Sequence, residues 1–207
     1  MRPTYSAVVF DMDGVLIDAR EWHYEALNEA LGIFGASISR AEHLARFDGL
    51  PTKVKLRMLT EDKRISEALI PLIESVKQER TLRAAARLCF PRIEHLIMIS
   101  ELRRRGLKLG VATNSIRMTA TQMLNFAGIY DSLDSLVTNE DVSQAKPDPA
   151  IYLLTCSKLG VDPSKVLVVE DNQYGIDAAK AAGCDVLQIS EPEQLNLQLL
   201  KPYLGDS

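Results

Sequence analysis

The chain has 207 residues, of which 46% are apolar and 25% charged, and its formal net charge is −4. This length fits one large domain or one domain with an insertion, and the apolar fraction supports a sizeable packed core. The negative charge gives no whole-molecule attraction to nucleic acid or to an anionic membrane, so neither is an expected partner.

No segment of the sequence has the pattern of an export signal or a membrane span. The apolar run 7–10 is too short for the core of a secretory signal, and no stretch approaches the length that a bilayer requires. Cys89, Cys156 and Cys184 are widely spaced and form no CxxC metal pattern. We interpret them as reduced thiols and expect a cytoplasmic protein.

Five short apolar runs, rich in β-branched residues, predict strands buried on both faces. They cover residues 7–10, 107–112, 135–138, 166–169 and 185–189. A helical pattern over 94–105 precedes the second of these runs, and three more, over 118–127, 150–159 and 174–182, lie between the later ones. Asp148 and Pro149 are read as the N-cap and first residue of the third helix. Three glycines occupy C-terminal cap positions of the others: Gly106, Gly128 and Gly183. This alternation predicts an α/β fold with an open, mostly parallel sheet covered by helices.

The segment between the first two strands is helical throughout. Helices are predicted over 22–34, 40–47, 52–59 and 66–88, with no strand among them. An insertion of this length indicates a separate helical subdomain. We therefore expect residues 18–89 to form that subdomain, and residues 1–17 and 90–207 to form the sheet-containing core.

Polar side chains follow the predicted strands where each strand ends. The stretch VVFDMDGVLID, 8–18, places Asp11 and Asp13 after the first strand. The other clusters are Thr113-Asn114-Ser115, Lys146 and Glu170-Asp171, after the second, third and fourth strands. A lone DxD would be read as a loop or a helix cap. Because ligands bind outside the carboxyl ends of strands in open α/β sheets, we expect the four clusters to converge on one site.

The collected side chains predict metal-assisted phosphate chemistry. Asp11, Asp13 and Asp171, with Glu170 as a possible fourth, suit a hard cation, and Mg²⁺ is the usual choice where phosphate is handled. Neither Cys nor His lies near these clusters in sequence to support a softer metal. Lys146 would add positive charge, and the Thr113 hydroxyl would bind phosphoryl oxygens.

The first two carboxylates have different predicted tasks. Asp11 would be the nucleophile that forms an acyl phosphate. Asp13, two residues on, would protonate the leaving oxygen and later deprotonate the attacking water. Gly14 would let the chain turn tightly beside the phosphate. Asp18 falls at the start of the insertion, where we expect no chemistry.

The four motifs, in this order, resemble those of the haloacid dehalogenase (HAD) superfamily, in its branch with a helical cap. The motifs are DMDGV (11–15), VATNS around Thr113, AKPDP around Lys146 and VVEDN around Glu170-Asp171. The resemblance implies a Rossmann-like core, Asp11 as nucleophile and Asp13 as acid/base with its backbone carbonyl on Mg²⁺. It also implies Asp171 as a direct metal ligand, with Glu170 a ligand or a carboxylate behind the metal.

Within this branch the sequence resembles β-phosphoglucomutase-like and phosphoglycolate phosphatase-like proteins. His23 stands where these often carry a His near the acid/base, and the stretch FDGLPT with Gly49 and Thr52 resembles the cap's specificity loop. Thr52 stands about where the mutase carries an Arg for a second phosphate, which weakens the mutase interpretation; substitution of that Arg by Lys53 or Lys55 is the open alternative. Asn114 and Ser115 are assigned to substrate binding. Arg117 has two equally open roles, a phosphate contact and a helix-surface residue.

The predicted function is a Mg²⁺-dependent phosphomonoesterase acting on a small phosphorylated metabolite such as a sugar phosphate. Two alternatives stay open: an intramolecular phosphotransferase of the β-phosphoglucomutase type, and a non-enzymatic switch that accepts phosphate. The expected partner is a small-molecule phosphate ester, and the expected oligomeric state is a monomer or a weak dimer.

Overall fold

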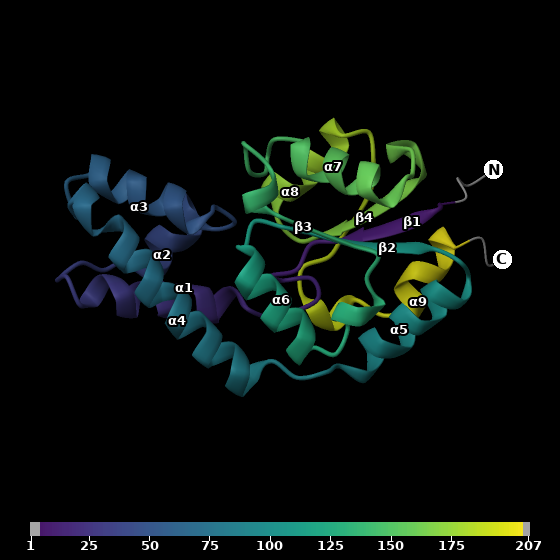
Figure 1. Cartoon of the computed structure of the whole chain (residues 1–207), viewed down its shortest axis with the longest axis horizontal. Coiled ribbons are helices and arrows are strands. Elements are labelled where there is room, and N and C mark those ends of the chain that lie inside the picture. Colours follow the sequence, from purple (N-terminus) through teal and green to yellow (C-terminus); the bar gives the residue numbers. More distant parts are fainter. Residues whose placement is uncertain (1–4, 205–207) are drawn as a thin grey trace. The chain divides into compact units, whose positions relative to one another are not determined.

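The computed structural model describes residues 5–204, which divide into two compact units. One unit holds the chain up to Asp18 and from Cys89 onward, and the other holds Ala19–Leu88. These junctions lie one residue away from the predicted boundaries at 17/18 and 89/90. Figure 1 labels helices and strands of both units.

The first unit is built on a five-stranded sheet in the order β3-β2-β1-β4-β5. Its strands are β1 (Ala7–Phe10), β2 (Lys108–Thr113), β3 (Ser135–Thr138), β4 (Val166–Glu170) and β5 (Asp185–Gln188). All neighbouring strands pair in parallel, and Phe10 of the central strand lies opposite both Val111 and Val169. The predicted fold class is therefore confirmed.

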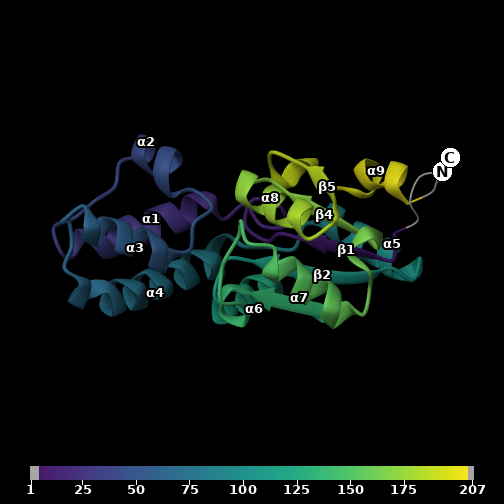
Figure 2. The same ribbon diagram turned by 90° about the horizontal axis from the view of Figure 1, so that it is seen from above.

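Helices cover both faces of this sheet. They are α5 (Ile93–Arg104), α6 (Arg117–Phe126), α7 (Ala150–Leu159), α8 (Gln173–Ala181) and the short α9 (Leu197–Leu200). Helices α7 and α8 lie together on one face, and α5, α6 and α9 lie on the other (Figures 1 and 2). This arrangement explains why the strands read as continuous apolar runs without alternation.

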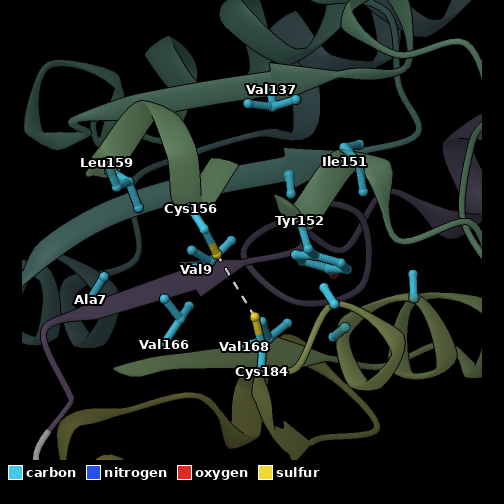
Figure 3. Packing of buried hydrophobic residues seen from close by; sticks show 14 residues of the cluster. Ala7, Val9, Val137, Ile151, Tyr152, Cys156, Leu159, Val166, Val168 and Cys184 are labelled. Carbon is cyan, nitrogen blue, oxygen red and sulfur yellow. Dashed lines mark hydrogen bonds between the residues drawn. The ribbon is translucent and has the colours of Figure 1, made fainter. Parts of the chain in front are cut away.

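A cluster of buried apolar side chains lies between the sheet and α7. Val9 and Val168 of the central strands pack against Ile151, Tyr152 and Cys156 of α7, as Figure 3 shows. Cys156 and Cys184 lie with their sulfur atoms 3.9 Å apart in this cluster, and all three cysteines are free thiols. A packed layer of this kind fixes the position of α7 on the sheet.

Three local predictions about this unit need correction. Thr113 and Glu170 are the last residues of β2 and β4, so they belong to the strands that they were expected to follow. Pro149, not Asp148, is the N-cap of α7, although Asp148 Oδ1 does accept a hydrogen bond from Ala150 N at 2.9 Å.

The three predicted cap glycines agree with the structure. Gly106, Gly128 and Gly183 all have positive φ, the backbone conformation that commonly ends a helix.

The second unit, Ala19–Leu88, is helical, with no strand among its residues. It comprises α1 (Arg20–Gly32), α2 (Arg40–Glu42), α3 (Thr52–Glu61) and α4 (Ile70–Leu88), and a 3₁₀ turn (Glu67–Leu69) precedes α4. Leu31, Phe47, Leu56 and Ile73 belong to its own hydrophobic core. The predicted single helix 40–47 is wrong, because α2 passes into a π-helix, His43–Phe47. An independent core agrees with a subdomain that packs by itself.

None of the helices between residues 5 and 204 combines the length and the apolar character needed to cross a membrane.

Candidate active site

The candidate site lies at the carboxyl ends of the three central strands. Asp11 follows β1, Thr113 ends β2 and Glu170 ends β4. Connections from β1 lead to β2 on one side, while β4 lies on its other side, so the strand order reverses here. Such a switch point is where open α/β sheets bind ligands, because the loops diverge and leave a crevice.

A buried lysine links two of the strand ends. Lys146, between β3 and α7, is 5% exposed, and its Nζ donates to Asp11 Oδ1 and to Glu170 Oε1, both at 2.6 Å. Burial alone would lower the pKa of Lys146, but the attraction of the two carboxylates outweighs it, and its pKa is raised. Lys146 is therefore an ammonium at neutral pH, held between two acids.

Glu170 receives hydrogen bonds on both carboxylate oxygens. Tyr152 OH donates to Oε1 at 2.7 Å, in addition to Lys146 Nζ. The backbone N–H groups of Asp171 and Asn172 donate to Oε2 at 3.0 and 3.2 Å. A carboxylate that is 1% exposed needs such compensation for lost hydration.

The same edge of the sheet gathers enough carboxylates to hold a cation. Asp11, Glu170 and Asp171 each offer an oxygen, and these oxygens lie within 4.8 Å of one another. Burial is the largest cause that raises the pKa of Asp11 well above its usual range; Lys146 opposes the shift. The repulsion of Glu170, Asp171 and Asp13 raises it further. A divalent cation among these oxygens would relieve that repulsion, and an all-oxygen donor set fits a hard metal.

Asp13 lies beside this group, and its carboxylate contacts the second motif. Ser115 Oγ donates to Asp13 Oδ2 at 2.8 Å, and Thr113 Oγ1 accepts from Ser115 N at 3.0 Å. The structure therefore brings the end of β2 next to the loop after β1. The carboxylate of Asp13 is outside the three-oxygen group, and its predicted metal contact through the backbone carbonyl stays a prediction.

The remaining motif residues join the segment after β2 to the segment after β3 by hydrogen bonds and an ion pair. Asn114 accepts from Lys146 N through Oδ1 at 3.3 Å and from Asn139 Nδ2 through its backbone carbonyl at 2.8 Å. Arg117 begins α6, and its guanidinium pairs with Asp141. That ion pair favours the surface role for Arg117 over the phosphate contact, and substrate binding by Asn114, Ser115 and Arg117 stays a prediction.

Two glycines are required by close approach to the acids. A Cβ at Gly14, which has φ of 95°, would lie 2.2 Å from Asp171 Oδ2. A Cβ at Gly175, in the first turn of α8, would lie 1.6 Å from Glu170 Oε1. Any side chain at either position would displace a carboxylate of the candidate site.

The other predicted substrate residues belong to the helical unit. The Nδ1 atom of His23, on α1, accepts a hydrogen bond from Lys77 Nζ at 3.0 Å. Gly49 has φ of 72° in the turn that follows the π-helix, and Thr52 is the first residue of α3. Their roles in substrate binding stay predictions.

Sequence reasoning missed Tyr152 and Gly175. Tyr152 stands among Ile151, Cys156 and Leu159 on the apolar face of α7, where a hydroxyl needs a partner. Gly175 is a weak helix former in the first turn of α8. The available signals were the hydroxyl of Tyr152 on an apolar helix face and the presence of Gly175 inside a helix, where no turn requires a glycine.

The sequence from residue 8 to residue 189 matches the family model of haloacid dehalogenase-like hydrolases. The chain belongs to this family. It is 32% identical over 179 residues to a phosphorylated carbohydrates phosphatase of Thermotoga maritima, covering 86% of this chain and 82% of that one. It is 29% identical over 199 residues to a fructose-1-phosphate phosphatase of Escherichia coli, covering 91% of this chain and 98% of that one. The predictions of the family and of an enzyme of its phosphatase type are confirmed.

Solved structures share the fold. A CbbY protein from Rhodobacter sphaeroides, crystallised with phosphate, is 26% identical with a TM-score of 0.80, over 89% of this chain and 86% of that one. A mutant of it, crystallised with xylulose-(1,5)bisphosphate, is 25% identical with a TM-score of 0.81, over 89% and 86%. A β-phosphoglucomutase from Clostridium difficile is 22% identical with a TM-score of 0.83, over 97% of each chain, and shows the fold alone.

Proposed function

We propose that this protein is a Mg²⁺-dependent phosphomonoesterase that acts on a small phosphorylated carbohydrate through an aspartyl-phosphate intermediate. One observation carries the proposal: a buried lysine bridges Asp11 and Glu170 beside a group of three carboxylate oxygens within 4.8 Å. Phosphoryl transfer needs positioning and charge neutralisation above all, and this arrangement offers both.

The first half-reaction transfers the phosphoryl group to Asp11. An oxygen of the Asp11 carboxylate forms a bond to phosphorus while the bond to the ester oxygen breaks, and Asp13 gives its proton to the departing alkoxide. Ser115 Oγ, 2.8 Å from Asp13 Oδ2, holds that carboxyl group in place. Lys146 neutralises charge on Asp11 and the phosphoryl oxygens, with Thr113 assigned to bind those oxygens.

The second half-reaction regenerates the enzyme. Asp13 takes a proton from water, the water oxygen bonds to phosphorus, and the bond to Asp11 breaks to release inorganic phosphate. Mg²⁺, when bound, supplies positive charge that screens the phosphoryl oxygens from the carboxylates. Asp11, Asp171 and the Asp13 carbonyl would hold it, with Glu170 a further ligand or a carboxylate behind it.

The substrate class is inferred from relatives. The relatives include phosphatases of phosphorylated carbohydrates and of fructose 1-phosphate, and a related structure holds a sugar bisphosphate. We infer that His23, Gly49 and Thr52 of the helical unit contribute to selecting the sugar part. A cytoplasmic location and a monomer or weak dimer remain predictions.

Replacing Asp11 tests the proposal. Purified protein with Mg²⁺ should release phosphate from at least one member of a panel of hexose, pentose and hexitol phosphates, and chelation by EDTA should stop the release. Asp11→Asn should abolish it, because an amide is not a nucleophile toward phosphorus, while circular dichroism shows the fold intact. Asp18→Asn is the matched control, since Asp18 is an exposed carboxylate of the same segment. Full activity in Asp11→Asn would refute the mechanism.

The mutase alternative is separated by its product. A phosphoglucomutase would convert sugar 1-phosphate to sugar 6-phosphate with little net phosphate release, whereas the phosphatase releases phosphate in proportion to ester consumed. The fold is shared with a β-phosphoglucomutase, so the fold does not separate the two activities. Thr52 in place of the mutase's second-phosphate Arg favours hydrolysis.

A further inference from the structure

We propose that Tyr152 is a positioning residue of this centre, whose hydroxyl and ring fix the Glu170 carboxylate and the Lys146 ammonium against each other. This rests on the proposed function, because it assigns the task of Tyr152 within the same site. Tyr152 does not belong to the four motifs, and it reaches the site from the side of the hydrophobic core.

The geometry places Tyr152 against both members of the buried ion pair. Its side chain is fully buried on α7, and its OH donates to Glu170 Oε1 at 2.7 Å. The Nζ of Lys146 lies 4.9 Å from the centroid of its ring. Figure 3 shows the ring extending from α7 towards the carboxyl end of β1, beyond Val9. One side chain thus stabilises the anion by a hydrogen bond and the cation by its ring face.

The hydroxyl matters because Lys146 is shared between two acids. Its Nζ lies 2.6 Å from both Asp11 Oδ1 and Glu170 Oε1. If Glu170 lost the Tyr152 hydrogen bond, a buried carboxylate would be left under-compensated and would draw Lys146 towards itself. The ammonium would then move away from Asp11, the proposed nucleophile.

Glu170 is held from its other sides as well. The backbone N–H groups of Asp171 and Asn172 donate to Oε2, and the Cα of Gly175 lies so close that an added Cβ would be 1.6 Å from Oε1. Tyr152 and Lys146 are therefore the side-chain contacts of a carboxylate that is otherwise held by the backbone. The position of Glu170 in turn fixes the start of the segment that carries Asp171, a proposed metal ligand.

A pair of isosteric substitutions on α7 tests this role. Tyr152→Phe removes the hydroxyl and keeps the ring. Thr155→Val is the matched control, because Thr155 is also fully buried and its hydroxyl bonds only within the helix, to Ile151 O at 2.7 Å, in the contacts described. Each variant is assayed for kcat and KM, and its melting temperature is measured as Mg²⁺ is raised.

Tyr152→Phe should lower kcat or raise the half-saturating Mg²⁺ concentration by about 10–100-fold, the usual effect of losing a residue that orients a metal ligand. Its KM for the ester should change by less than about 3-fold, because a positioning residue acts on the reacting groups and not on the sugar. Thr155→Val should leave kcat and the Mg²⁺ dependence of melting near those of the unchanged protein.

Equal kcat and equal Mg²⁺ dependence in Tyr152→Phe and the unchanged protein would overturn the proposal, as would equal losses in Tyr152→Phe and Thr155→Val. Tyr152→Leu, which removes the ring as well, should lose more than Tyr152→Phe; an equal loss would overturn the part assigned to the ring. If the unchanged protein hydrolyses no phosphate ester but Mg²⁺ raises its melting temperature, the proposed function fails, and the Mg²⁺ midpoint of Tyr152→Phe still decides the role of Tyr152. If Mg²⁺ has no effect on the unchanged protein, both proposals fail.

Discussion

The two units of the chain differ in how deeply their predicted site residues are buried. In the sheet unit, Asp11, Lys146 and Glu170 are at most 8% exposed, and Lys146 Nζ lies 2.6 Å from an oxygen of each carboxylate. In the helical unit, the predicted substrate residues His23, Gly49 and Thr52 are only half-buried and lie on separate elements. A buried charge network tolerates little change, because each member compensates the others. A half-buried residue can be substituted without disturbing its neighbours. Substrate selection can therefore change while the buried charged residues stay the same.

The largest expected effect is in the buried network. Lys146→Met should abolish most phosphate release, by about 100-fold or more, and should destabilise the fold by about 3–5 kcal/mol, because it leaves buried carboxylates uncompensated. Lys165→Met, at an exposed lysine just before β4, is the control and should be nearly neutral. Urea unfolding and a phosphate-release assay measure the two effects. If Lys146→Met changed neither the unfolding free energy nor the rate of phosphate release, the buried network would be no more sensitive to substitution than the half-buried residues of the helical unit.

Two glycine substitutions compare the units directly. Gly175→Ala should cost about 1–3 kcal/mol, because its Cβ would lie 1.6 Å from Glu170 Oε1. Gly32→Ala, at the end of α1, meets no atom within 4 Å and should instead stabilise by about 0.4–1 kcal/mol through a less flexible unfolded chain. The shift in melting temperature shows whether each substitution stabilises or destabilises the fold. A stabilising Gly175→Ala would mean that Glu170 can move freely.

The helical unit has one buried titratable group with a predictable acid response. His43 is 3% exposed, lies edge-on to Tyr24 with ring centroids 5.0 Å apart, and has Asp48 Oδ1 3.7 Å from its Nε2. Burial lowers its pKa from 6.5 to about 4; the positive charge of Lys55 also lowers it, and Asp48 opposes the shift. The charged groups facing His43 also include Arg40, and His23 is a further titratable neighbour.

Because the folded pKa of His43 is depressed, the unfolded chain binds the extra proton first. Its stabilising contribution is complete above about pH 6.5 and is lost as the pH falls towards 4, by about 1–3 kcal/mol. The difference in unfolding free energy between the unchanged protein and His43→Leu should therefore shrink over that window. A difference that stays constant from pH 7 to pH 4.5 would contradict this assignment.

The smallest expected effect concerns Arg117. If it serves the surface of α6, as its ion pair with Asp141 favours, Arg117→Ala should cost less than about 1 kcal/mol and leave KM unchanged. If it contacts phosphate, KM should rise about 10-fold or more, since a charge-assisted hydrogen bond is lost. Steady-state kinetics on the best ester of the panel decide between these roles, with Arg83→Ala, at an exposed site of α4, as the control.

Much of the sheet unit followed from its sequence. Apolar, β-branched runs predicted the five strands, and the bounds of β1 and β3 were predicted to the residue. The misplaced ends of β2 and β4 concern Thr113 and Glu170, polar residues that the apolar pattern excluded from the strands although their backbones continue the pairing. The π-helix His43–Phe47 was not predictable from periodicity, because its geometry is an exception to the 3.6-residue turn.

The sequence by itself determined the alternation of strands and helices, the helical insertion, and the acidic, hydroxyl and lysine residues that follow the strands. These features are local, because they depend on periodicity and on which residue ends a strand. Only the tertiary structure decided that Lys146 lies between Asp11 and Glu170. It also decided that Tyr152 of α7 donates a hydrogen bond to Glu170 and that Gly175 leaves room for the Glu170 carboxylate. Those contacts join residues far apart in the chain, and they form only when the parallel sheet brings its strand ends together and the packed core fixes α7 and α8 against it.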